Sequence, residues 1–361
     1  MYSYDNNSQL NQKSLIIGGV KQQTQIYQFD TEGMVVATTD VLTRLTTRRY
    51  DQLGRLIEVK DALGGITILK YDNRNNLISI INPNGNKNLF VYDRNNRLLK
   101  EIRSLGQIIS YQYNEVGRRI EQVDPKGQKI EYFFDDAERI VETRYYRNGI
   151  NIPQNIVRFS YDKLNQLTGY DDGVSTASYQ YNEIQKRIGE SISYGTFVLN
   201  QTYQYYGNGL LKKYIEPDGN NYIFNYNVNN QLNSISVSGL GNVGFDNYLS
   251  NKPQKITLPG GVTKELSYDS LLRDKRILVK KASGETLMDY KYNYDQVGNI
   301  LSKNTLSGQY SYTYDALDRL ITAQNPNLLD EAYSYDLVGN RLSDIRVNGD
   351  WIYNDNDELL S

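Results

Sequence analysis

Short apolar runs alternate with polar turns along this chain, and one such pattern returns at a nearly constant spacing. Residues 70–100 read KYDNRNNLISIINPNGNKNLFVYDRNNRLLK, in which Tyr-Asp followed by a polar turn and an apolar stretch occurs twice, 21 residues apart. Apolar runs rich in Ile, Leu, Val and aromatics and bounded by Asn, Asp and Gly predict β-strands, and two such runs joined by a tight turn predict a hairpin. The pattern therefore predicts β-hairpins in series.

An aromatic anchor ends the first strand of each predicted hairpin. Successive anchors are 21 residues apart from Phe29 to Phe134 and 18 to 27 residues apart elsewhere. A period near 20 indicates a repeat array rather than the core of an enzyme. We expect a single array over residues 1–361, with regular units at 29–134 and looser units with insertions at 135–361, truncated at both ends. The seventeen anchors are Tyr4, Phe29, Tyr50, Tyr71, Tyr92, Tyr113, Phe134, Tyr161, Tyr181, Tyr205, Tyr226, Tyr248, Tyr268, Tyr294, Tyr314, Tyr335 and Tyr353.

The residues after each anchor are those that a tight turn requires. Asp or Asn follows the anchor in fifteen units, where its side chain can accept bonds from backbone N–H groups further on. Gly or Asn stands four residues after the anchor in ten units, and both residues adopt a positive φ at low cost. The pattern predicts a three- or four-residue hairpin loop with a bulge. The structural repeat signature that we select is Tyr50, Asp51, Gly54, Tyr71, Asp72, Asn75, Tyr92, Asp93, Asn96, Tyr113, Gly117, Tyr161, Asp162, Tyr294, Asp295, Gly298, Tyr314, Asp315, Tyr335, Asp336 and Gly339.

A second turn closes each unit on the opposite side. It is rich in Pro, Asn and Gly, as at 61–65, 82–85, 124–127, 217–219 and 259–261. Hairpins joined by tight turns on both sides make one continuous antiparallel ribbon. The predicted fold class is all-β, with about seventeen hairpins and about 34 strands spiralling into part of a hollow shell.

Aromatic residues recur on one predicted face of this ribbon. A second aromatic stands two residues before the anchor in thirteen units, as at Phe90 and Tyr111, and period two places it on the anchor's face. We expect ladders of stacked rings that stabilise the ribbon, with Tyr hydroxyls turned to water or a polar lumen. Platforms for stacking sugars are the alternative interpretation. The opposite face is mixed, so neither face resembles the dry core of a sandwich.

The amino-acid composition limits the kinds of catalytic and metal-binding sites that the chain can form. The chain has 33 Tyr but no His and no Cys, which excludes the usual triads, thiol nucleophiles and thiolate metal sites. The adjacent carboxylate pairs Asp135-Asp136 and Asp171-Asp172 fall at expected turns, and the runs 47–49 and 280–281 are too short for a nucleic-acid groove. A net charge of −2 offers no general attraction for phosphate backbones. We predict no catalytic, cofactor-binding or metal-binding residue, no cofactor, no nucleic-acid partner and no membrane span.

The series of signatures, with copies as full as YDQLGRLIEV (50–59), YDQVGNIL (294–301) and YDALDRLI (314–321), resembles the YD repeats of Rhs and teneurin-like proteins. The resemblance covers essentially the whole chain. It implies a β-ribbon that spirals into a hollow shell, as in Rhs polymorphic toxins, the B and C components of insecticidal toxin complexes and teneurins. Residues 124–127 read DPKG, the letters of the family's DPxG autoproteolysis site, but their regular second-turn position favours an ordinary hairpin turn.

The resemblance implies a function without catalysis. In the toxins the shell holds a C-terminal effector, so we predict a scaffold segment of such a shell, secreted or at the cell surface, with further YD repeats and an effector cargo as partners. The alternative is a cell-surface adhesion or carbohydrate-binding module with glycans as partners. At ~4.8 Å per strand about 34 strands make a ribbon of roughly 160 Å, about one turn around a cargo of ~100 residues. Enclosing such a cargo therefore requires more repeats.

Overall fold

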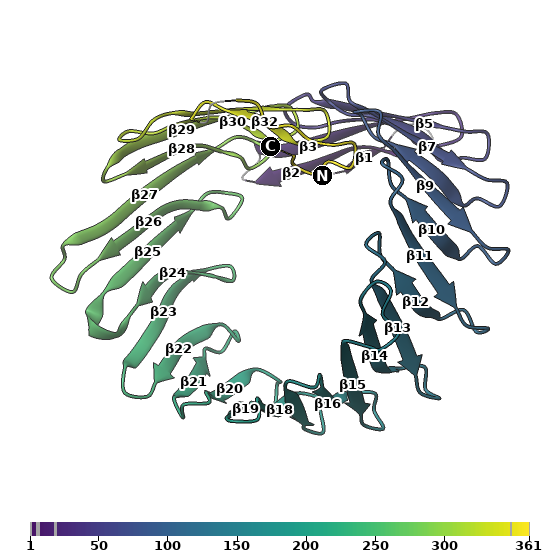
Figure 1. Ribbon diagram of the computed structural model, residues 1–361. Helices are drawn as coiled ribbons and strands as arrows, with labels where there is room; N and C mark the ends of the chain where they lie inside the picture. The colour runs from purple at the N-terminus through teal and green to yellow at the C-terminus, as the bar shows by residue number, and fades with distance from the viewer. Residues whose placement is uncertain (1, 5–7, 18–19, 347–348, 361) are drawn as a thin grey trace. The chain divides into compact units, whose positions relative to one another are not determined.

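The computed structural model describes residues 2–4, 8–17, 20–346 and 349–360 of the chain. This part consists of short strands joined by tight turns, with a single 3₁₀ turn as its only helical element (Figure 1). None of its helices is long and apolar enough to cross a membrane. The elements are β1 (Tyr2–Tyr4), β2 (Leu10–Ile17), β3 (Val20–Phe29), β4 (Val35–Thr39), β5 (Leu45–Tyr50), β6 (Leu56–Lys60), β7 (Ile66–Tyr71), β8 (Leu77–Ile81), β9 (Lys87–Tyr92), β10 (Leu98–Ile102), β11 (Ile108–Tyr113), β12 (Arg119–Val123), β13 (Lys129–Phe134), β14 (Ile140–Tyr146), β15 (Asn155–Tyr161), β16 (Leu167–Asp171), β17 (Thr176–Tyr181), β18 (Arg187–Ser193), β19 (Val198–Tyr205), β20 (Leu211–Ile215), β21 (Asn221–Tyr226), β22 (Leu232–Val237), β23 (Gly241–Leu249), β24 (Lys252–Thr257), η1 (Pro259–Gly261), β25 (Thr263–Tyr268), β26 (Asp274–Lys280), β27 (Thr286–Tyr294), β28 (Ile300–Thr305), β29 (Gly308–Tyr314), β30 (Leu320–Gln324), β31 (Glu331–Tyr335) and β32 (Arg341–Asp344).

The strands belong to two compact units. Unit 1 comprises Met1–Ile108, Leu266–Leu278 and Met288–Ser361, and unit 2 comprises Ile109–Glu265 and Val279–Leu287. In unit 1 each strand from β1 to β10 pairs antiparallel with the next, and so does each strand from β27 to β32. In unit 2 the same order runs from β11 to β25.

The predicted all-β class of serial antiparallel hairpins is confirmed. The described residues hold 32 strands instead of about 34. The last unit accounts for the difference, because Tyr353 and Leu359 form an isolated bridge in place of two strands. The other anchors end the odd-numbered strands, except that Tyr248 stands one residue before the end of β23.

A bulge stands at the anchor of almost every hairpin, as the turn pattern predicts. Tyr71 pairs with Leu77 and the register shifts between Lys70 and Tyr71, which leaves one extra residue on the second strand. The fourth residue after the anchor has a positive φ, 73° at Gly54 and 65° at Asn75. Gly and Asn dominate this position because they tolerate that conformation best. The repeated bulge gives every first turn the same geometry.

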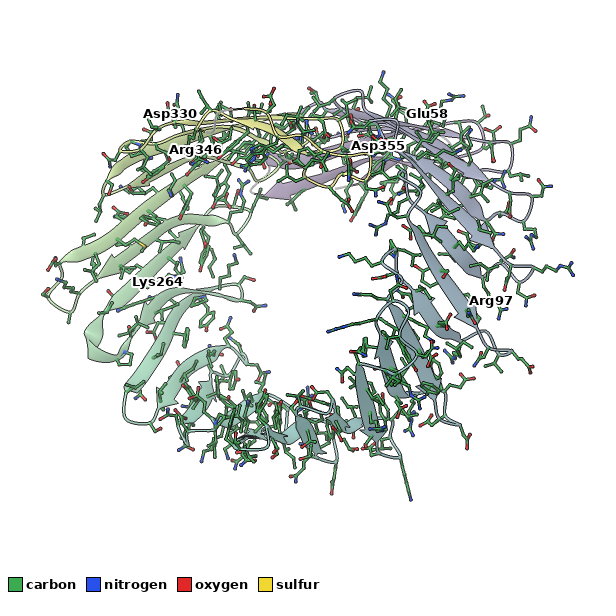
Figure 2. The ribbon with its side chains drawn as sticks, in the orientation of Figure 1. Glu58, Arg97, Lys264, Asp330, Arg346 and Asp355 are labelled. Atoms are coloured by element: carbon green, nitrogen blue, oxygen red, sulfur yellow. The ribbon has the colours of Figure 1, made fainter. Side chains whose placement is uncertain are left out.

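The ribbon lacks a conventional core in the part of the chain that the structure describes. Side chains stand on both faces of the sheet (Figure 2), and no large side chain is completely buried. The buried apolar residues are few and scattered over separate strands: Ala37, Tyr146, Ala177, Leu278 and Ala323. The expectation that neither face forms the dry core of a sandwich is therefore confirmed. Backbone ladders and contacts between turns must contribute much of the stability that a core supplies elsewhere.

Candidate functional site: the inter-repeat cluster

The aspartate after each anchor organises its own turn. In the unit that begins at Tyr50, Asp51 Oδ1 accepts bonds from the backbone N–H groups of Leu53 and Arg55 at 2.9 and 3.0 Å. The main chain closes the same turn, because Asp51 and Arg55 pair through the N–H of Asp51 and the carbonyl of Arg55. A carboxylate in this place satisfies donors that the bulge would otherwise leave unpaired.

The residue five positions after the anchor links each turn to the next repeat. Arg55 Nε donates to Asp51 Oδ2 at 2.7 Å, while Arg55 Nη1 donates to the backbone oxygen of Asp72 at 2.9 Å and to Asn75 Oδ1 at 3.0 Å. The guanidinium also lies 5.0 Å from the centre of the Tyr71 ring. One arginine thus joins its own aspartate to the turn and the anchor of the following hairpin. We call this set of contacts the inter-repeat cluster.

The same cluster recurs along the ribbon with different members. Arg139 bonds Asp135, the backbone oxygen of Asp162 and Asn165, and it lies 4.8 Å from the Tyr161 ring. Further copies centre on Arg273, which reaches the Asp295 carbonyl and the Tyr294 ring, and on Arg319, which reaches the Asp336 carbonyl and the Tyr335 ring.

Asparagine performs the linking role in other units. Asn76 Nδ2 donates to Asp72 Oδ2 and to Asn96 Oδ1 of the next repeat, both at 2.9 Å. Asn299 and Asn340 make the corresponding pairs of bonds from their own aspartates to the following turns. A short amide and a long guanidinium can therefore both link a turn to the next repeat, although the two side chains differ in length.

The anchor hydroxyl makes the connection in the opposite direction. Tyr50 Oη donates to the backbone oxygen of Val35 at 3.0 Å, and Tyr161 Oη donates to that of Ile140 at 2.9 Å. The acceptor is in each case the residue that faces the preceding anchor across the bulge. The expectation that these hydroxyls meet water or a lumen is wrong for such anchors. The bulge leaves a carbonyl free of the ladder, and the tyrosine satisfies it.

Cations stand between many of the rings, which corrects the expectation of continuous aromatic ladders. Arg119 on β12 lies 5.5 Å from the Tyr111 ring on β11 and 5.4 Å from the Tyr132 ring on β13. Ring-to-ring contacts are local, as between Tyr203 and Tyr214 at 5.2 Å. Equivalent rings of successive repeats are two strands apart, about 9.5 Å, and so beyond the ~4.5–7 Å of direct ring contact. The intervening strand supplies the residue that fills this gap.

The electrostatic environment favours the ionised aspartates. The backbone N–H of Arg55 holds the pKa of Asp51 below its usual value, and the side chain of Asn76 does so for Asp72. The side chain of Arg139 lowers the pKa of Asp135 in the same way. Burial raises the pKa of the Tyr294 anchor, with the charge of Asp274 adding to the effect. These groups are therefore charged aspartates and neutral tyrosines across a wide pH range.

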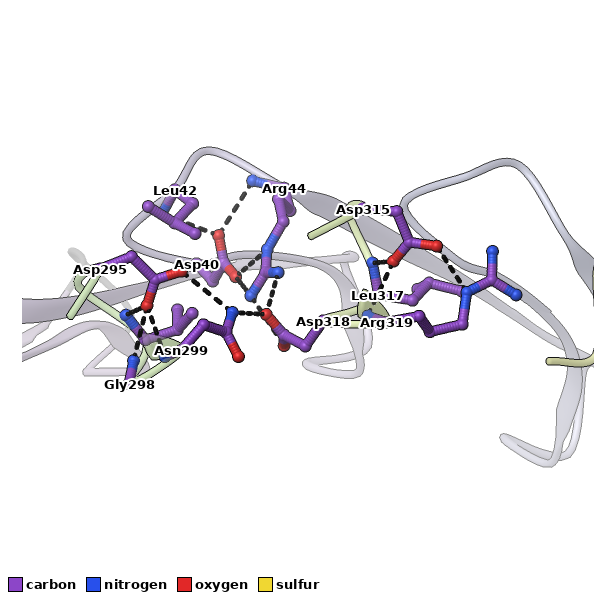
Figure 3. A network of polar contacts seen from close by, with 11 residues as sticks. Asp40, Leu42, Arg44, Asp295, Gly298, Asn299, Asp315, Leu317, Asp318 and Arg319 are labelled. Atoms are coloured by element: carbon purple, nitrogen blue, oxygen red, sulfur yellow. Dashed lines mark hydrogen bonds and ion pairs between the residues drawn. The ribbon is translucent and has the colours of Figure 1, made fainter. Parts of the chain in front are cut away.

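Distant repeats of unit 1 also meet, and they do so turn against turn. Arg44, between β4 and β5, places Nη1 2.7 Å from Asp318 Oδ1, while its Nε lies 2.6 Å from Asp40 Oδ2 (Figure 3). Asn299 donates to Asp318 at 2.6 Å in the same network. The second turn of one hairpin thus contacts the first turn of a hairpin 274 residues later.

Two further contacts join early and late hairpins of unit 1 in the same way. We call these two contacts, together with the Arg44–Asp318 pair, the seam. Asn84 Nδ2 donates to Asp336 Oδ2 at 2.8 Å, and Asn356 Nδ2 donates to Gln107 Oε1 at 2.7 Å. A hollow of about 250 Å³ lies at its start, between the turn at Asp40 and the turn at Val297. Every seam contact joins a second turn of an early hairpin to a first turn of a late one.

The cluster couples the turns of neighbouring repeats. Within the described residues, no three His, Cys, Asp or Glu side chains come together in a way that could hold a metal ion. Asp135 and Asp136 lie in a first turn, and Asp171 and Asp172 at a second turn, as their positions predict. Residues 124–127 form a regular turn in which Asp124 Oδ1 accepts two backbone bonds, which confirms the hairpin-turn interpretation of DPKG.

The structure places every residue of the selected signature at a first turn or at its anchor. Some of them, such as Asp72 and Asn75, accept the bonds that link neighbouring units. Sequence reasoning missed the linking position five residues after the anchor. Its signal was present, because Arg, Asn or Gln recurs there, as at Arg55, Asn76 and Gln166. The seam carries no such signal, since no periodicity states which distant turns will meet.

The structure is a β-ribbon of serial antiparallel hairpins whose turns are joined by the inter-repeat cluster. The sequence profile of the family described as Teneurin YD-shell matches residues 1–142. No curated protein matches the chain. The resemblance to the Rhs and teneurin-like YD repeats is therefore confirmed, with the sequence match confined to the N-terminal part.

Solved structures extend the fold likeness over the rest of the chain. TcdB2-TccC3 without its hypervariable C-terminal region superposes with a TM-score of 0.77 at 15% identity, covering 99% of this chain and 24% of that chain. The Photorhabdus luminescens Tc holotoxin pore carrying a TccC3 mutation gives 0.74 at 15% identity, with 99% and 24% covered. The chain has the fold of these shell proteins and spans about a quarter of their length.

Proposed function

We propose that this chain is a non-catalytic scaffold, a segment of an Rhs-type β shell that encloses a C-terminal toxin or effector domain. The observation that best supports this proposal is the inter-repeat cluster. It ties many hairpins forward through Arg55-type side chains and backward through Tyr161-type hydroxyls, so that neighbouring hairpins are held together without a conventional core. Such a wall leaves one face available to a cargo.

The comparisons support a shell over a catalytic protein. The neighbours are TcdB2-TccC3 assemblies and a Tc holotoxin pore, and the shared fold covers nearly all of this chain. Because the chain spans 24% of their length, further YD repeats are the expected partners. A secreted or surface-exposed location follows from the same proposal. Glycan binding remains the alternative prediction, and no contact described above favours it.

Protease protection tests the proposal. The full-length product that contains this chain is purified, and its cargo is digested with protease while the shell is intact and again after denaturant has opened the shell. We expect the cargo to resist digestion only before opening, whereas the same cargo without the shell is cut at once. A cargo that is cut equally fast in both samples would overturn the proposal, and saturable glycan binding by such a preparation would favour the adhesion module.

A further inference from the structure

One repeat position changes its environment along the ribbon. The third residue after the anchor lies at the tip of the first turn. In unit 2 this tip is largely exposed, at 72% for Val116, 62% for Leu164 and 56% for Ile184. At the seam of unit 1 the equivalent Val297 and Val338 are half-buried. We call Val116, Leu164 and Ile184 the first-turn edge.

The opposite side of the ribbon shows the same contrast. Val41 and Leu42 lie in the second turn that meets the seam, and both are half-buried. The second turns of unit 2 leave Ile152, Val174 and Leu240 more than 70% exposed, at 73%, 79% and 71%. We call these three residues the second-turn edge. Unit 2 thus presents apolar tips on both edges, in the same turns that cover one another at the seam.

We propose that the first-turn edge is a docking surface for the second-turn edge of another YD-repeat ribbon. The inference deepens the proposed function, on which it rests, by assigning a partner and a direction to the open edges. The seam is the internal template: it always joins a first turn to a second turn, through side-chain bonds such as Asn84 to Asp336 beside apolar tips. Exposed apolar residues that gather on one surface mark interaction sites. The exposed tips of unit 2 lie in the same two kinds of turn that meet at the seam.

The chemistry selects a ribbon edge as the occupant. First turns recur along the ribbon every two strands, about 9.5 Å, so the apolar tips stand at multiples of that spacing. Another ribbon with the same repeat offers turns at matching intervals. The interface is heterologous, because it joins two different edges, and it therefore leaves one edge of each kind free for further addition. A second copy of this chain offers both edges and serves as the probe.

Charge substitutions on the two edges test the docking. One variant carries Val116→Lys, Leu164→Lys and Ile184→Lys, and the other carries Ile152→Glu, Val174→Glu and Leu240→Glu. A matched control carries Ser160→Lys, Gln180→Lys and Gln204→Lys on exposed strand positions away from the turns. Circular dichroism confirms that each chain is folded before sedimentation equilibrium measures its association.

We expect the wild type and the control to self-associate, and each edge variant alone to do so at least about tenfold more weakly, because a lone charge is costly to desolvate against an apolar tip. Mixing the two edge variants restores association as pairs of unlike chains. A wild type that stays monomeric at every concentration overturns the proposal, and so do edge variants that associate as the wild type does. No cargo is present, so this outcome is separate from the protease-protection result.

Discussion

Arg44 and Asp318 are 274 residues apart in the sequence, yet Nη1 of the arginine lies 2.7 Å from Oδ1 of the aspartate. A second bond from Nη2 to Oδ2 at 3.3 Å makes the pair bidentate. The side-chain bond from Arg44 is the main cause that lowers the pKa of Asp318, although the Asp318 side chain is 42% exposed. The pair directly connects an early and a late hairpin of unit 1.

Removing this pair should loosen unit 1 without unfolding the hairpins. We expect Asp318→Asn to lower the free energy of unfolding by about 0.5–1 kcal/mol, because a partly exposed ion pair is screened by solvent. A double-mutant cycle with Arg44→Gln, measured by chemical denaturation at low and high salt, isolates the coupling. Coupling near zero at low salt would contradict the prediction.

The forked arginine of the inter-repeat cluster should not be replaceable by lysine. Arg319 bonds Asp315 and the Asp336 carbonyl and lies 4.9 Å from the Tyr335 ring, and both members of its ion pair are less than 20% exposed. Arg319→Lys keeps the charge but cannot reach all three partners, so we expect a loss of about 1–2 kcal/mol. Thermal and denaturant unfolding measure it.

Arg94→Lys is the matched control, because Arg94 is an exposed turn residue. We expect its effect to stay within about 0.5 kcal/mol. Equal effects at the two arginines would show that charge, rather than the forked geometry, carries the link between repeats.

We expect the hydroxyl group of the anchor tyrosine to contribute to the free energy of unfolding in addition to the packing of its ring. Tyr161→Phe keeps the ring and removes the bond to the Ile140 carbonyl, which leaves that carbonyl without its donor. We expect a loss of about 0.5–1.5 kcal/mol. Tyr145→Phe, at an exposed tyrosine, is the control and should be neutral. Identical unfolding curves for the wild type and Tyr161→Phe would show that water replaces the hydroxyl at no cost.

One turn carries a residue that is poorly suited to its backbone. Gln185 occupies the positive-φ position at 60°, where the other units favour Gly or Asn, and its side chain is exposed. We expect Gln185→Gly to stabilise the protein by about 0.4–1 kcal/mol, since relief of strain at this φ outweighs the added freedom of the unfolded chain. Ile184→Gly, one position earlier at an ordinary φ, should not stabilise. A lower melting temperature for Gln185→Gly would contradict this account.

We expect low pH to weaken the interactions that the aspartates make within and between repeats. The folded pKa values of Asp51, Asp72 and Asp135 lie below the ordinary 3.8. Their contribution is therefore fully present above that value and is lost as the pH falls through the folded pKa values. We expect the melting temperature to be flat from about pH 5 to 8 and to drop steeply below about pH 4. A melting temperature that is unchanged at pH 3 would contradict the role of these carboxylates.

The sequence by itself determined the hairpin, its turns and its repeat. Asp51 and Gly54 are local requirements of one turn, and local requirements repeat with the sequence, so the period exposed the fold class and the family resemblance. Arg55 occupies a position at which Arg, Asn or Gln recurs in the sequence. Its role as a link could not be predicted, because the distance from its side chain to the next turn is set by the register of the sheet.

The tertiary structure alone decided which turns meet at long range. Arg44 in a second turn and Arg55 in a first turn each bond the aspartate four residues earlier. Yet Arg55 contacts the next repeat, whereas Arg44 contacts a residue 274 positions away. Small bends and twists at each hairpin accumulate over many strands, and their sum sets which edges come together. A periodic pattern is the same in every unit and cannot encode that sum, which is why the seam and the exposed edges emerged only from the folded chain.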